Sequence, residues 1–265
     1  MIRMAPDIVN KHELKPMNSI EHRHRNIHSD DAALFSGARL QHVQRAVFEL
    51  CWLLNRGYAR PSAIKLVGDH HRLTKRQRLA ISRAACSDAS RKARAEKCVA
   101  IEQLRNQPLT IDGFNLIITV ETAIAGGLLL RCGDDCIRDL ASVHGTYRQV
   151  QETPLALDDI GQALETLAPE SVLWLFDAPV SNSGQLAAMV RSLAGSHGWN
   201  WQAELADNPD QTIIAGAGIA VSSDSVILDG ASRWTNFNTY LLAQYFPKAW
   251  VLDFSHDLDG LEPPP

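Results

Sequence analysis

From about residue 108 onward, short apolar runs typical of buried strands alternate with amphipathic runs typical of helices. The strand-like runs include LTID at 109–112, SVLWLFD at 171–177 and GIAVSSD at 218–224. Alternation of this kind predicts a mostly parallel sheet with helices on both of its faces. We therefore expect residues 108–255 to form an α/β domain.

Further elements follow from the same pattern. The runs at 128–132, 199–205 and 249–255 predict additional strands. Helices are expected, from their apolar spacing, at 115–127, 134–145, 155–168, 183–198 and 235–246.

The chain before residue 108 has a different character. Apolar residues at 40, 43, 47, 50, 51 and 54 follow the helical template, and further helical segments continue to about residue 103. We expect a small all-α domain at residues 38–105. Residues 1–35 lack apolar periodicity and are expected to be a mobile tail, as are residues 256–265.

Charge divides the chain in the same place. Residues 1–109 hold 20 Lys and Arg against 10 Asp and Glu, whereas residues 110–265 hold 6 against 20. A basic module beside an acidic one suggests that the first contacts a polyanion such as RNA and the second concentrates carboxylates. The stretch GDHHRLTKRQR at 68–78 is a candidate phosphate-contacting surface. The alternative is that both regions are solvated faces that attract each other.

The cysteines and the apolar segments bear on location. The five cysteines are odd in number and fit reduced thiols in a cytoplasm better than a disulfide framework. The first residues have no apolar segment typical of a signal peptide, and the run LIITVETAIAGGLLL is too short and too polar to span a bilayer. We expect a cytoplasmic protein with no membrane partner.

Three of the strand-like runs end on or near an aspartate, at Asp112, Asp177 and Asp224. The carboxyl ends of parallel strands are where α/β sheets bind ligands, so these acids are expected to meet at one edge. Gathered carboxylates repel one another, and a hard divalent cation such as Mg²⁺ or Mn²⁺ would relieve that repulsion. The alternative for each residue is a helix N-cap. Asp253 ends a further run and is a weaker case.

The stretches TIDGFNL, FDAPVSNSG and VSSDSVI resemble the PIN-like nuclease superfamily, in particular its NYN-type branch. The resemblance covers about residues 108–255, and the whole chain also resembles a bacterial and archaeal domain-of-unknown-function family. It implies that Asp112, Asp177 and Asp224 bind a divalent metal and cut RNA. The residues implied to position the substrate or these acids are Asn115, Ser181, Asn182 and Ser225.

Members of that superfamily commonly have one more acid between the first two motifs. The candidates here are Glu121, Asp134, Asp135 and Asp139, with Asp229 as a possible outer acid. On the predicted helix at 134–145, Asp135 and Asp139 would share one face. We take Asp135 as the fourth metal ligand.

Histidines offer a second set of potential ligands. His22, His24 and His28 lie in the predicted tail, and Asp69, His70 and His71 lie in the basic stretch. Adjacent histidines on a helix are expected to point in different directions, which favours surface polar residues over a metal site. The sequence thus predicts a metal-dependent ribonuclease. The alternatives are a nucleic-acid-binding or regulatory protein with a degenerate site, and another carboxylate–Mg²⁺ phosphotransferase or phosphatase.

Overall fold

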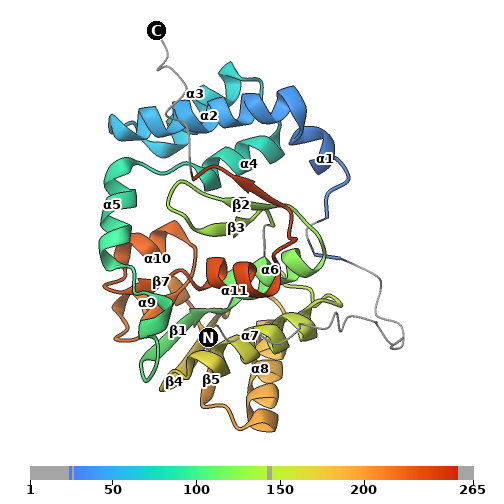
Figure 1. Cartoon of the computed structure of the whole chain (residues 1–265), viewed down its shortest axis with the longest axis vertical. Helices are drawn as coiled ribbons and strands as arrows, with labels where there is room; N and C mark the ends of the chain where they lie inside the picture. Colours follow the sequence, from blue (N-terminus) through green and yellow to red (C-terminus); the bar gives the residue numbers. More distant parts are fainter. Residues whose placement is uncertain (1–23, 26, 142–144, 256–265) are drawn as a thin grey trace, which may run out of the picture.

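The computed structural model describes residues 24–25, 27–141 and 145–255. A five-stranded parallel sheet flanked by helices occupies one end of the molecule, and N-terminal helices occupy the other (Figure 1). The α/β class and the helical N-terminal region predicted from the sequence are therefore confirmed. No helix in the described ranges combines the length and the apolar character that a bilayer crossing requires.

The five-stranded sheet has the order β5-β4-β1-β6-β7, and all of its neighbouring strands pair in parallel. Its strands are β1 (Pro108–Asp112), β4 (Ser171–Asp177), β5 (Trp201–Ala206), β6 (Ile219–Val221) and β7 (Trp234–Thr235). The chain runs outward from β1 to β4 and β5, then returns to the other side of β1 to form β6. The carboxyl edge around β1 is thus the topological switch point, where open α/β sheets bind ligands.

Both faces of this sheet are buried, which explains the continuous apolar runs of its strands. Trp174 and Phe176 lie in the core on one face, whereas Leu173 and Leu175 contact the core on the other. The first core includes α6 (Gly113–Ile124), α7 (Thr153–Leu167), α8 (Ser183–His197) and α11 (Phe237–Tyr245). The second includes α9 (Pro209–Ala215) and α10 (Ser225–Gly230).

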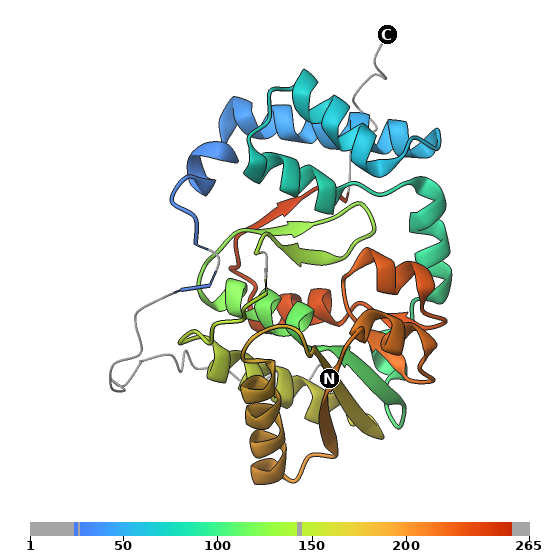
Figure 2. The ribbon, with the colours of Figure 1, turned by 180° about the vertical axis from the view of Figure 1, so that it is seen from behind.

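A second sheet lies between the N-terminal helices and the first sheet in both views of the ribbon (Figures 1 and 2). It has the order β3-β2-β8 and consists of β2 (Leu129–Arg131), β3 (Ile137–Asp139) and β8 (Val251–Asp253). The N-terminal elements are α1 (Asp31–Leu34), α2 (Gly37–Asn55), α3 (Arg60–His70), α4 (Lys75–Ala84), α5 (Asp88–Lys97) and the 3₁₀ helix η1 (Ile101–Gln103). Leu130 and Phe254 share one core with Leu50 and Ile81, so the helical region packs on strands from the other half of the chain.

Two expectations differ from the structure. The helix predicted at 134–145 is absent from the described part of that range, which instead forms the turn and second strand of a β2–β3 hairpin. The tail predicted at 1–35 is too long, because Asp31 is buried and accepts hydrogen bonds of 2.8 and 2.7 Å from the Arg76 guanidinium. Residues 1–23 and 256–265 lie outside the described part of the chain.

Candidate functional site

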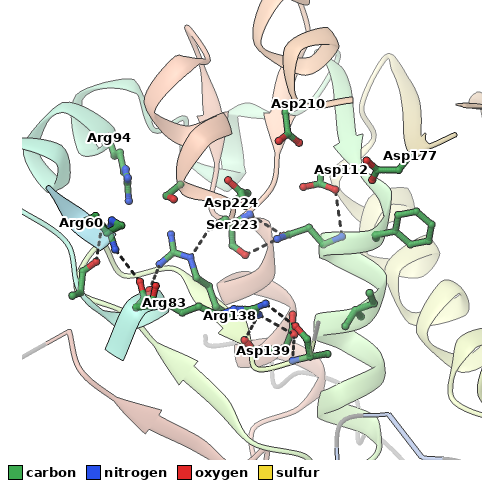
Figure 3. A pocket seen from close by; sticks show the side chains of 17 residues that line it. Arg60, Arg83, Arg94, Asp112, Arg138, Asp139, Asp177, Asp210, Ser223 and Asp224 are labelled. Atoms are coloured by element: carbon green, nitrogen blue, oxygen red, sulfur yellow. Dashed lines mark hydrogen bonds and ion pairs between the residues drawn. The ribbon is translucent and has the colours of Figure 1, made fainter. Parts of the chain in front are cut away.

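A cavity of about 410 Å³ opens at the carboxyl edge of the five-stranded sheet. Four carboxylates from the strand ends of this sheet line it, those of Asp112, Asp177, Asp210 and Asp224, and Asp139 of the second sheet lines it as well. Four arginines, Arg60, Arg83, Arg94 and Arg138, line its other side (Figure 3). We call this cavity the acidic cleft and the four carboxylates the cleft acids.

Asp112 is placed by the junction between β1 and α6. It is the N-cap of α6 and accepts a hydrogen bond of 3.3 Å from the Asn115 backbone N–H. Gly113 makes this junction possible, because a Cβ there would lie 2.2 Å from the Phe176 ring. The hydroxyl of Ser222 donates to the second oxygen of Asp112 at 2.8 Å. Asp112 is therefore both a helix cap and a cleft residue.

Asp224 is placed by a matching junction after β6. It is the N-cap of α10 and accepts from the Val226 N–H at 2.7 Å, while its own N–H donates to the Ser222 hydroxyl at 2.9 Å. Asn115 joins the two junctions, since its side-chain oxygen accepts from the Ser223 N–H at 2.9 Å. The ends of β1 and β6 are thus held together by polar side chains. Asn115 thus links the junctions that carry Asp112 and Asp224, and its predicted role in positioning an acid or the phosphate stays a prediction.

Asp177 and Asp210 extend the row of acids in the opposite direction. Asp177 is the last residue of β4, which is the neighbour of β1. Asp210 lies in the first turn of α9, which follows β5 and is capped by Asn208. The cleft acids therefore come from the carboxyl ends of four adjacent strands. Asp210 was missed by sequence reasoning, although applying the strand-end rule to β5 and the DNPD that follows would have found it.

The electrostatics of the cleft disfavour a full set of charged carboxylates. The pKa of Asp112 is raised to about 7, because burial and, to a smaller extent, the charges of Asp210 and Asp224 outweigh the hydrogen bonds from Ser222 and Asn115. Burial also raises the pKa of Asp210, with additional repulsion from Asp224 and Asp177. Burial raises the pKa of Asp177. Among the described residues, no ion pair relieves any of the four.

The remaining substrate-positioning predictions have different outcomes. Ser225 lines the cleft beside Asp224. Ser181 and Asn182 are not among the cleft residues, because they hold the segment that follows the β2–β3 hairpin. The Asn182 side chain donates to the Tyr147 carbonyl at 2.7 Å, and the Ser181 carbonyl accepts from the Tyr147 N–H.

The prediction for the fourth acid is corrected. Asp135 lies at the tip of the β2–β3 hairpin with a φ of 62°, is exposed, and is not part of the cleft. Asp139 does line the cleft, but it pairs with Arg83 and accepts from the Ala141 N–H at 2.6 Å. Asp253 lies in β8 of the second sheet, 3.9 Å from Arg131.

The other candidate acids are bound to cations. Glu121 is fully buried and accepts from Arg25 at 2.6 Å. Asp134 contacts Arg94 and pairs with Arg138 at 2.6 Å. Burial favours the neutral form of Asp134, but Arg138 and Arg94 outweigh it and hold its pKa below the ordinary value. Asp229 pairs with Arg94 at 2.7 Å. These acids neutralise arginines and leave no charge for a metal.

Arg60 differs from the other three arginines of the cleft in its partners. Arg83, Arg94 and Arg138 each pair with an aspartate. The Arg60 guanidinium donates to the backbone carbonyls of Ser82 and Ala85, at 2.9 and 3.2 Å, and forms no ion pair within the described residues. Arg60 therefore brings an uncompensated positive charge to the cleft.

The donor set fits a hard divalent cation, because it consists of carboxylate oxygens that form no ion pair within the described residues. The cleft acids do not place three carboxylate oxygens within 4.8 Å of one another. In the described chain, a trio of candidate ligands within 4.8 Å of one another occurs elsewhere, at Glu49, His70 and His71. The wider spacing suits Mg²⁺ or Mn²⁺, which commonly keep several waters and take one or two carboxylates together with substrate phosphates.

Comparisons with known proteins agree with the two-part organisation of the chain. Residues 42–97 match a family described as a protein of unknown function (DUF434). Residues 101–240, just over half of the chain, match a domain of unknown function (DUF5616). No solved structure matches the chain. An uncharacterized protein of Methanocaldococcus jannaschii, MJ0935, is 30% identical over 186 residues, which are 70% of this chain and 88% of the relative. The chain therefore belongs to the DUF5616 family.

Proposed function

We propose that the protein is a metal-dependent phosphodiesterase that cleaves RNA at the acidic cleft. The observation that carries this proposal is the row of cleft acids, which gathers four carboxylates from adjacent strand ends, none of which forms an ion pair among the described residues. A purely structural role would be expected to pair such acids, as the chain does with Asp134 and Glu121. The PIN-like resemblance of the sequence points to the same chemistry.

The two sides of the cleft would have different roles in cleaving a phosphodiester. The cleft acids would hold Mg²⁺ or Mn²⁺, which supplies an activated water and neutralises charge on the phosphate. Arg60 would bind a non-bridging phosphate oxygen from the opposite side, because its guanidinium has donors and no carboxylate partner within the described chain. Asn115 and Ser222 would keep Asp112 and Asp224 at a fixed separation.

The RNA preference comes from the resemblance and from the basic N-terminal half. Part of that basic charge forms ion pairs with acids of the same chain. Arg78 pairs with Asp69 at 2.8 Å, and Arg76 holds Asp31. The predicted 68–78 surface therefore offers less free charge to RNA than its sequence suggests, and Arg60 is the stronger phosphate contact. All five cysteines are free thiols, which supports a cytoplasmic location.

Hydrolysis of single-stranded RNA by the purified chain tests the proposal. We expect cleavage that requires Mn²⁺ or Mg²⁺, is abolished by EDTA and falls by at least about 100-fold in Asp177→Asn, since a missing metal ligand removes charge stabilisation of the transition state. Asp135→Asn is the matched control, because Asp135 is exposed and outside the cleft. Equal cleavage by Asp177→Asn and wild type would contradict the proposal.

A second candidate function is RNA binding without cleavage. The absence of a tight trio of ligands among the four described cleft acids favours it, because a degenerate site would retain charge but not coordination. It predicts binding that weakens steeply with salt and no turnover under any metal. The same assay separates the two functions, since only the phosphodiesterase yields shortened products.

A further inference from the structure

We propose a second metal site, for Zn²⁺ or a similar transition ion, between α2 and α3. Its ligands are Glu49 on α2 and the consecutive histidines His70 and His71 at the end of α3. One ligand atom from each of the three lies within 4.8 Å of the others. The site is chemically distinct from the acidic cleft, because imidazole nitrogens select zinc-like ions, whereas an all-carboxylate set selects Mg²⁺ or Mn²⁺.

The end of α3 brings the two histidines together. His70 is the last helical residue and His71 is the C-cap, after which Arg72 adopts a left-handed φ of 51°. The chain leaves the helix at this point, and the two rings meet edge to face with centroids 4.9 Å apart. The expectation that adjacent histidines point in different directions assumed a continuing helix and is wrong here.

Glu49 supplies the third ligand from the neighbouring helix. Its carboxylate lies 2.8 Å from the His71 Nε2, and the side chains are 14% and 10% exposed respectively. A zinc ion with bonds near 2.1 Å would separate two ligand atoms by roughly 3.3 Å, so the Glu49–His71 pair needs only a small adjustment. Metal binding through Nε2 would replace the hydrogen bond that this nitrogen donates to Glu49, because a histidine ligand binds through an unprotonated nitrogen.

The helix dipole and the neighbouring Arg45 account for only part of this arrangement. A histidine at a helix C-terminus interacts favourably with the dipole, which accounts for one imidazole but not for the second or the carboxylate. Arg45 lies 3.4 Å from Glu49 and offsets part of its charge, but it contacts Oε1, whereas His71 contacts Oε2. The trio leaves a fourth tetrahedral position for water, and the bound ion would fasten α3 to α2.

Cobalt binding to the full-length, chelator-treated protein tests this site, because Co²⁺ is visible where Zn²⁺ is spectroscopically silent. We expect one Co²⁺ to give a tetrahedral visible spectrum that Zn²⁺ abolishes by displacement, and Zn²⁺ to raise the Tm. His71→Ala and Glu49→Gln should each weaken Co²⁺ binding by at least about tenfold. The two variants change different helices, and circular dichroism checks that each of them remains folded.

Three controls separate this site from other ligands. His42→Ala removes an exposed histidine of α2 and should leave binding unchanged. The triple variant His22→Ala/His24→Ala/His28→Ala removes three histidines near the N-terminus and should also bind Co²⁺ normally. Asp112→Asn should retain the cobalt site even if it abolishes RNA cleavage. Wild-type affinity in both His71→Ala and Glu49→Gln, or loss of binding only in the triple variant, would overturn the proposal.

Discussion

The acids of this protein fall into two groups that differ in their partners. Asp31, Glu121, Asp134 and Asp139 are buried, and each forms an ion pair with an arginine. The cleft acids lie at the edge of the five-stranded sheet and form no ion pair within the described chain. Burial raises the pKa of Asp112, Asp177 and Asp210, while the arginines lower that of Asp134 despite its burial. Burial also raises the pKa of Glu121 against Arg25, so the ion pairs, and not the pKa alone, distinguish the two groups.

This difference separates structural charge from functional charge. An acid paired with arginine is satisfied, and its removal leaves a buried cation without a partner. An acid whose pKa is raised is disfavoured in its charged form until a proton or a metal cation binds, and such groups concentrate at functional sites. The comparison predicts that paired acids affect stability and that cleft acids affect activity.

The largest effect is expected from Asp134→Asn. The carboxylate of Asp134 is shared by the buried Arg94 and Arg138, and the variant replaces it with a neutral amide. We therefore expect the free energy of unfolding to fall by about 3–5 kcal/mol. Urea denaturation measures it. Asp88→Asn is the control, because Asp88 is exposed and pairs with Arg91 at 3.5 Å, which limits its cost to about 1 kcal/mol. Equal losses in both variants would remove the distinction between the groups.

Arg60→Ala tests the cation that has no ion-pair partner in the described chain. If Arg60 binds phosphate, kcat/KM for RNA cleavage should fall about 10- to 100-fold, and the salt dependence of RNA binding should become shallower by about one phosphate contact. Arg60→Lys should recover part of the loss. Lys92→Ala removes an exposed charge of α5 and serves as the comparison. A loss no greater than that of Lys92→Ala would exclude Arg60 from substrate binding.

Asp112→Asn should increase stability in a pH-dependent way. Because the folded-state pKa of Asp112 is about 7, above its ordinary value of 3.8, its contribution to stability is present at low pH and is lost as pH rises towards 7. Asn avoids that loss and can still cap α6. At pH 8 without metal, we expect the variant to be more stable than wild type by about 1–2 kcal/mol, with the gain disappearing near pH 4. Thermal unfolding across this pH range measures the difference, and a gain independent of pH would contradict it.

The smallest effect is expected from Asp229→Asn. Asp229 pairs with Arg94, but its side chain is 53% exposed and Asp134 remains as the second partner of Arg94. We expect a loss of about 0.5–1 kcal/mol in the free energy of unfolding and unchanged RNA cleavage. A large loss of cleavage with normal stability would instead show that Asp229 acts in cleavage, as the cleft acids are proposed to do.

The sequence predicted the parts of this architecture that depend on local pattern. The apolar strands and their terminal acids at Asp112, Asp177 and Asp224 were readable because parallel strands are buried on both faces. The alternative of helix caps is also true for Asp112 and Asp224, which shows that capping and lining a cleft are compatible. Asp210 was missed because it lies one helical turn beyond the end of β5 and not on the strand itself.

The errors arose where distant segments decide the structure. The 134–145 stretch has helix-like apolar spacing, yet β2 pairs with β3 on one side and with β8, more than a hundred residues away, on the other. The local apolar spacing of the sequence cannot predict the pairing of β2 with β8. Because this stretch forms a hairpin, Asp135 lies at the hairpin tip and not on the predicted helix facing the site. Convergence of Glu49 with His70 and His71 likewise depends on how α2 packs against α3.

Manganese binding tests the central claim most directly. Electron paramagnetic resonance of the full-length His70→Ala/His71→Ala protein at pH 8 counts bound Mn²⁺ without the α2–α3 site. We predict Mn²⁺ binding that Asp112→Asn and Asp210→Asn each weaken by at least about tenfold, while Asp135→Asn leaves it unchanged. Equal Mn²⁺ affinity in the parent protein and in both cleft variants would contradict the claim that these carboxylates hold a metal together.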